Sequence, residues 1–128
     1  MTVDVRSASL ARARALAQAA MRDPDRCDAS LADAEALLVI AAGPARDHVD
    51  ALTCLGAVLC DQAKYREAVG VLQRAARLRS DDRNTYFNLG VALLHCGKRR
   101  QAMACFRRAA PLRASPCTWE AYFDPQAQ

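Results

Sequence analysis

The sequence predicts an all-α domain built from stacked helical hairpins, and three observations lead to this prediction. First, 52% of the 128 residues are apolar but only 5% are aromatic. Ala and Leu therefore supply most of the packing, which suits closely spaced helices. Second, the chain has only five Gly and five Pro, and several of them stand between apolar periodic segments, where turns are expected. Third, the sequence contains an internal repeat, which is typical of stacked architectures.

The repeat aligns residues 49–82 with residues 83–116 without a gap, at a period of 34 residues. We expect each unit to be a helical hairpin, in which a glycine of the first helix and an alanine of the second permit a short distance between the helix axes. The residues predicted to make this packing are Leu55, Gly56, Leu59, Ala68, Leu72 and Ala75 in the first unit, and Leu89, Gly90, Leu93, Ala102, Phe106 and Ala109 in the second.

These positions resemble the tetratricopeptide (TPR) consensus, which has a large residue, Leu-Gly, a large residue, Ala, an aromatic residue and Ala. Leu59 and Leu72 depart from the consensus, which has aromatic residues there, and Ser80 and Ala114 stand where the family often has Pro. The resemblance implies a solenoid of about three stacked hairpins within one domain, residues 1–128. A single hairpin cannot bury its apolar face, which is why such repeats stack.

Residues 5–44 are expected to form a degenerate first repeat. An Ala-rich helix from about Val5 to Met21 precedes the turn residues Asp23-Pro24-Asp25. A second helix follows, with Asp28 or Ser30 as its predicted N-cap, and ends at Gly43-Pro44.

Residues 117–128 are expected to form a cap and tail. Ser115-Pro116 is suited to begin a short capping helix, and this helix would carry Trp119, Tyr122 and Phe123. We expect these aromatic side chains to pack on the exposed end of the solenoid. The alternative is a contact with a partner or with a second copy, because aromatic residues are frequent anchors of interfaces.

The resemblance implies that function lies in a concave groove lined by the first helix of each repeat. The groove residues carried over from the family are Thr53, Cys54, Ala57, Cys60, Asn84, Phe87, Asn88, Val91, Leu94 and His95, and in the degenerate repeat Arg14, Gln18 and Met21. Asn88 stands where the family often uses Asn to bind the backbone of a ligand. The basic residues that clamp a terminal carboxylate in chaperone-adaptor members are missing beside it. Phe87, Val91 and Leu94 suit an apolar or amphipathic segment.

These features predict a protein-binding module, a chaperone or adaptor that holds a segment of another protein or peptide. The size and layout are also similar to small TPR chaperones of bacterial type III secretion. One alternative is a structural assembly subunit that associates through its ends, and a homodimer is compatible with either hypothesis. Another alternative is binding of nucleic acid or an anionic surface through arginines of the second helices, such as Arg99, Arg100, Arg107 and Arg108; nucleic acid is the less favoured partner.

Composition and motifs argue against other classes of function. The formal net charge is +4, an excess too mild to favour a polyanionic partner. The sequence has no nucleophile elbow, metal-ligand motif or phosphate-binding glycine loop, so we predict neither an enzyme nor a cofactor, a metal or a small-molecule substrate. With no membrane span or signal peptide apparent, the predicted location is cytoplasmic. The six cysteines are then expected to be small, buried and reduced.

Overall fold

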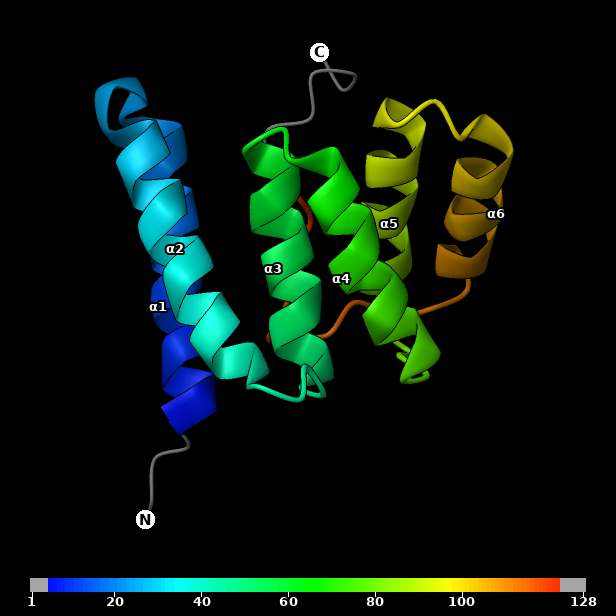
Figure 1. The fold of residues 1–128 in the computed structure, drawn as a ribbon, viewed down its shortest axis with the longest axis horizontal. Helices are drawn as coiled ribbons and strands as arrows, with labels where there is room; N and C mark the ends of the chain where they lie inside the picture. The colour runs from blue at the N-terminus through cyan, green and yellow to red at the C-terminus, as the bar shows by residue number, and fades with distance from the viewer. Residues whose placement is uncertain (1–4, 123–128) are drawn as a thin grey trace.

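The computed structural model describes residues 5–122, and all regular structure in that range is helical. The helices are α1 (Val5–Arg22), α2 (Cys27–Ala42), α3 (Val49–Asp61), α4 (Tyr65–Arg77), α5 (Arg83–His95) and α6 (Arg99–Ala109), with a 3₁₀ turn, η1 (Pro24–Arg26), between the first two. They form three hairpins, α1–α2, α3–α4 and α5–α6, and each hairpin packs on the next (Figure 1). The prediction of an all-α chain is thus confirmed.

Helix α3 is the centre of the molecule. All ten residues from 51 to 60 are buried, because α3 contacts α1, α2, α4 and α5. A helix that is apolar on every side needs such surroundings. By contrast α4 and α6 bury one stripe each and expose their arginines Arg66, Arg77, Arg99, Arg100, Arg107 and Arg108.

The close approach inside the last two hairpins occurs at the two aligned glycines. A Cβ atom built on Gly56 would lie 2.3 Å from Cγ of Leu72, and one on Gly90 would lie 2.5 Å from the ring of Phe106. These distances are far below van der Waals contact. The two helix pairs therefore meet at the positions that the repeat alignment brings into correspondence.

The turn after the first helix is also alike in the two aligned units. Lys64 N–H donates to the carbonyl of Leu59 at 2.8 Å, and Lys98 N–H donates to that of Leu93 at 2.9 Å. The turn residue has a positive φ in both units, 60° at Ala63 and 77° at Gly97. Glycine adopts this left-handed conformation without strain, whereas an alanine is strained there.

Helix α2 begins differently from the prediction. Its first residue is Cys27, and its N-cap residue, Arg26, makes no side-chain capping bond. Asp28 and Ser30 lie inside the helix and are not caps. The cause is the turn η1, which leads directly into α2 and is itself capped by the side chain of Asp23.

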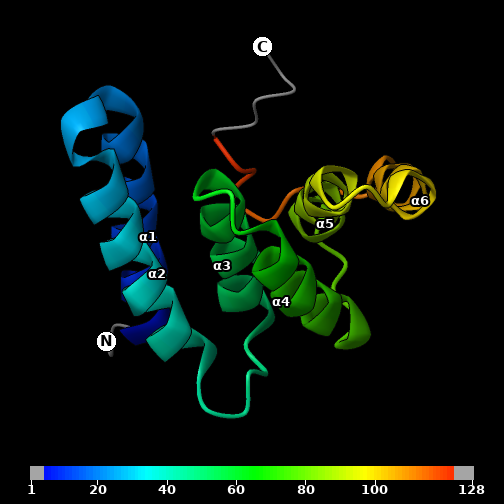
Figure 2. The same ribbon diagram turned by 45° about the horizontal axis from the view of Figure 1, so that its top comes forward.

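The predicted C-terminal capping helix is wrong for the residues that the structure describes. Residues 115–122 contain no helix, and Phe123 lies outside the described range. The segment does not cover the end of the last hairpin as expected. It turns back beside α3 and α5, as Figures 1 and 2 show by the orange-red part of the chain. Its backbone groups find partners on side chains of other elements (described below), so it has no need of a helical turn.

Candidate functional site

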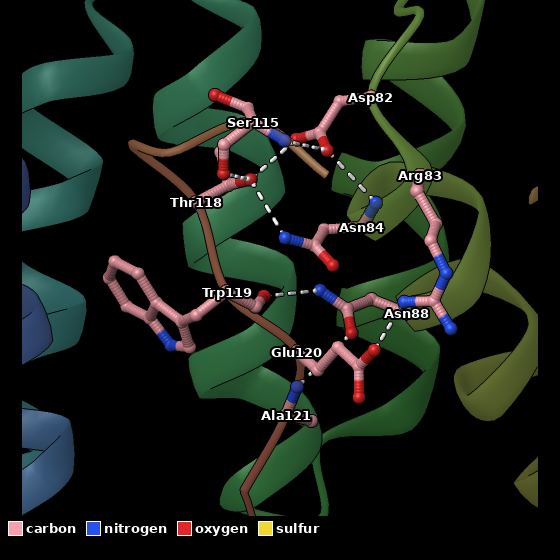
Figure 3. A network of polar contacts seen from close by, with 9 residues as sticks. All are labelled: Asp82, Arg83, Asn84, Asn88, Ser115, Thr118, Trp119, Glu120 and Ala121. Carbon is pink, nitrogen blue, oxygen red and sulfur yellow. Dashed lines mark hydrogen bonds and ion pairs between the residues drawn. The ribbon is translucent and has the colours of Figure 1, made fainter. Parts of the chain in front are cut away.

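The face of the molecule on which residues 115–122 lie is the candidate site, and we call it the inner face. It is formed by α1, α3 and α5, and the side chains that contact the segment are Arg14, Cys54, Asp82, Arg83, Asn84 and Asn88. Figure 3 shows the segment running along α3, with α5 at its side. The site is therefore an elongated surface with an extended piece of backbone bound to it.

Asn88 makes the most specific contact with the segment. Its side-chain Nδ2 donates to the carbonyl of Trp119 at 3.0 Å, and its Oδ1 accepts from the N–H of Ala121 at 3.1 Å. Asn88 is fully buried; its bond to the Trp119 carbonyl is buried as well, and its bond from the Ala121 N–H is partly buried. One side-chain amide thus bonds to a carbonyl and an N–H that lie two residues apart. In an extended backbone these groups are free to bond to a side chain, whereas in a helix they bond to other backbone groups.

A second polar cluster lies one turn earlier on α5. Asp82 caps the helix by accepting from Asn84 N–H at 3.0 Å, and it also accepts from Ser115 N–H at 2.9 Å and from the Thr118 hydroxyl at 2.6 Å. The same hydroxyl accepts from the side chain of Asn84 at 3.0 Å (Figure 3). A buried carboxylate needs such donors, because burial without them is costly.

Three further contacts fix the remaining residues of the segment. The Arg14 guanidinium reaches the carbonyl of Pro116 at 3.4 Å, and the Cys54 thiol reaches that of Cys117 at 3.5 Å. Burial raises the pKa of the Cys54 thiol well above its ordinary value, which keeps the proton that it donates. Finally, Arg83 and Glu120 form an ion pair.

Trp119 is the apolar anchor of the segment. Its indole points away from Asn88 (Figure 3) and is only 3% exposed, within the hydrophobic core. The guanidinium of Arg14, on α1, stands 5.9 Å from the ring centre. The indole Nε1 is buried without a hydrogen-bond partner among the described residues. The face thus combines backbone recognition with one buried aromatic side chain.

The structure brings together only part of the predicted groove. Cys54, Asn84, Asn88 and Arg14 contact the segment, as described above. Thr53 instead bonds to Thr85 at 2.6 Å, and the Cys60 thiol lies 3.9 Å from the carbonyl of Asn88. Of the others, Ala57 and Val91 are buried, Leu94 and Gln18 are half-buried, and Met21 is exposed.

Two predicted groove residues pack against helices of their own chain. Phe87 lies against Phe106 of α6, with ring centres 5.5 Å apart, and His95 stacks on Tyr65 of α4 at 4.1 Å. The predicted apolar lining of the groove is therefore largely internal packing.

Asp82 and Arg83 were not among the predicted site residues, because Asp82 precedes α5 and Arg83 is its first residue, and neither belongs to the aligned face of the helix. The extended form of residues 115–122 was not predicted either. The available signal was the spacing of Asn84 and Asn88, four residues apart, which places both amide side chains on one side of α5.

Among residues 5–122 no group of three or more His, Cys, Asp or Glu side chains is placed to hold a metal ion. Over the same range, no helix is both long and apolar enough to cross a bilayer. In comparisons with known proteins, no protein-family model matches the chain, and no curated protein matches it.

Proposed function

We propose that the chain is a protein-binding module of the tetratricopeptide type, a chaperone or adaptor that holds an extended segment of a partner protein on the inner face. The observation that carries the proposal is the paired contact of Asn88 with the carbonyl of Trp119 and the N–H of Ala121. Such a contact recognises extended polypeptide whatever its side chains.

The agreement of structural details at a spacing of 34 residues supports the tetratricopeptide part of the proposal. His48 and Asp82 both cap the first helix of their units through the side chain. Gly56 and Gly90 are both sites of close approach, and Ala63 and Gly97 both turn with a positive φ. Units that agree in cap, contact and turn are the basis of a stacked repeat.

The contacts also favour an extended partner over the amphipathic one expected from sequence. Phe87, which was predicted to suit an apolar or amphipathic segment, instead packs against Phe106 of its own chain. The inner face offers instead amide, carboxylate and thiol groups that pair with backbone and hydroxyl groups. A helical ligand has its backbone groups already bonded and would leave these side chains without partners.

The two alternative functions receive less support. Self-association through Trp119 would require an exposed ring, but this ring is 3% exposed within one chain. The arginines of α4 and α6 that would bind an anionic surface are exposed to solvent. Cations are favoured near helix C-termini without any ligand, so these arginines are no specific sign of an anionic partner.

The test is site-specific photo-crosslinking followed by binding. A photoreactive amino acid at position 14, at the edge of the inner face, is used in the native source to capture a partner, and the crosslinked segment is mapped and synthesised. We expect this synthetic segment to bind the full-length protein and Asn88→Ala to weaken binding at least about tenfold, the effect of losing one well-made hydrogen bond in a buried site.

The matched control is Gln101→Ala, a change at an exposed position of α6, which is expected to leave the dissociation constant unchanged. Equal binding of the segment to the wild-type protein and to Asn88→Ala, measured by calorimetry on variants of equal helicity, would refute the proposal.

A further inference from the structure

Residues 115–121 occupy the surface that a partner would need. Each of these residues is bound through its backbone or side chain, from Ser115 at Asp82 to Ala121 at Asn88. Asn88 and Asp82 cannot serve this segment and a second peptide together, because the hydrogen-bonding atoms that they direct at the segment are in use. A partner can bind these side chains only after the segment has left.

We infer that residues 115–122 are an intramolecular competitor of the partner, and that the partner segment has their chemistry: a hydroxyl residue, an aromatic residue directly after it, and a non-proline residue two positions further on. This inference rests on the proposed function, because it defines which extended segment the inner face selects and how access to that face is controlled.

The hydroxyl is required by Asp82. Asp82 is 5% exposed, and its carboxylate takes a hydrogen bond from the Thr118 hydroxyl at 2.6 Å, while this hydroxyl in turn accepts from the Asn84 side chain at 3.0 Å. Only a group that both donates and accepts satisfies these two side chains at once, and Ser and Thr carry such a group. An alanine there would leave a buried carboxylate short of a donor.

The aromatic residue is required by the space that Trp119 fills. The ring belongs to the hydrophobic core and lies beneath the Arg14 guanidinium, an arrangement in which any flat aromatic ring attracts the cation. The buried indole Nε1 has no partner among the described residues, which weakens the hold of this particular ring. The chain's own segment is therefore a ligand that another aromatic segment can displace.

The third requirement comes from Asn88. Its Oδ1 accepts from the N–H of residue 121, and a proline in that position has no N–H to donate. Glu120, between the anchor and this position, is exposed and pairs with Arg83; an exposed pair contributes little, so this position is the least selective.

A partner protein is a better candidate for the competitor than a second copy of this chain. The segment is tethered to its own site, which corresponds to an effective concentration of about 1 mM for a short linker. A second copy presents the same residues at its far lower free concentration, without any added contact. A different protein can bind more tightly by offering a better aromatic anchor.

The experiment uses the full chain and its single tryptophan, labelled as 5-fluorotryptophan and observed by fluorine NMR. The probe is an unlabelled peptide of residues 115–122, Ser-Pro-Cys-Thr-Trp-Glu-Ala-Tyr, kept reduced. We expect one buried resonance for the free protein, and its conversion to the position of the urea-unfolded protein as the peptide is added above the effective concentration of the tethered segment, about 1 mM. A peptide with alanine at the Thr and Trp positions should have no effect.

Two variants sharpen the test. Ala121→Pro weakens the tethered segment but leaves the inner face intact, so the peptide should displace Trp119 at a concentration at least about tenfold lower, because more of the face is free to bind. Asn88→Ala damages the face itself, and should show a released Trp119 without peptide and no binding of labelled peptide.

Three outcomes would overturn the inference: a released Trp119 in the wild-type protein, peptide binding that leaves Trp119 buried, or a concentration-dependent dimer in sedimentation that exchanges this segment between copies. In each case, Asn88-dependent binding of the crosslinked partner would still stand, so the failure is separate from that of the proposed function.

Discussion

At the scale of single residues, two glycines of neighbouring helices have opposite surroundings, one crowded and one open. Gly56 faces Leu72, which is fully buried, and three atoms of that leucine lie within 2.7 Å of where a Cβ would be. Gly70, in the interior of α4, has nothing within 4 Å of that position. The first glycine makes room for a neighbour, and the second only lowers the helix propensity.

We therefore predict opposite effects of the same substitution. Gly56→Ala should destabilise the fold by about 1–3 kcal/mol, the usual cost of overpacking a core. Gly70→Ala should stabilise it by about 0.5–1 kcal/mol through helix propensity. Urea unfolding of both variants beside the wild type measures these changes. If Gly56→Ala also stabilises, the close contact between α3 and α4 is not as the structure describes.

At the scale of elements, acidic residues at the N-termini of α3 and α5 interact electrostatically. Asp50 lies in the first turn of α3, and Asp82 is the N-cap of α5. Burial, followed by the negative charge of Asp82, raises the pKa of the Asp50 carboxyl above its ordinary value. The folded protein therefore holds a proton at Asp50 more tightly than the unfolded chain does.

The sign of the pH dependence follows from this difference. Between the ordinary and the raised pKa the folded state binds more protons, so Asp50 makes the protein less stable as the pH rises through that interval. We predict that Asp50→Asn has a higher Tm than the wild type at pH 7, and that the difference disappears near pH 3, where both states are protonated. A difference in Tm that is constant with pH would contradict this account. Calorimetry over the pH range is the measurement.

At the same scale, the C-terminal segment shows why a helix predicted from local sequence can be wrong. Ser115-Pro116 is a sound helix start by local rules, and the sequence offers no competing local structure. Yet the polar groups of Asn88 and Asp82 bind the segment in an extended form. Partners that lie about thirty residues away in the chain decide its conformation, and local propensity has no access to them.

At the scale of the whole molecule, burial sorts the cysteines into three classes. All six are free. Cys54 and Cys60 are buried in α3, whereas Cys117 is exposed on the bound segment. Because α3 is enclosed by four helices, its thiols become reachable only when the molecule opens.

We predict that iodoacetamide alkylates Cys117 first in the native protein and Cys54 and Cys60 last. The half-exposed Cys27, Cys96 and Cys105 should react at intermediate rates. A raised thiol pKa at Cys54, Cys27 and Cys105 slows these residues further, because the thiolate is the reactive form. Peptide mapping by mass spectrometry gives the order, and equal rates in urea serve as the control. Early labelling of Cys60 would show that α3 is not enclosed.

The sequence by itself determined the helices of this protein and the register of its two aligned hairpins. Both depend on local features, namely helix propensity, turn residues and a repeated pattern of small and large side chains. These features can be read along a single sequence. It also pointed to Asn88 as a residue that binds backbone. The tertiary structure alone decided what Asn88 binds, that Phe87 packs inward against Phe106, and that the C-terminal segment is extended. These three results depend on contacts between residues distant in sequence, where buried polar groups must find partners, and only the folded arrangement brings those partners within reach.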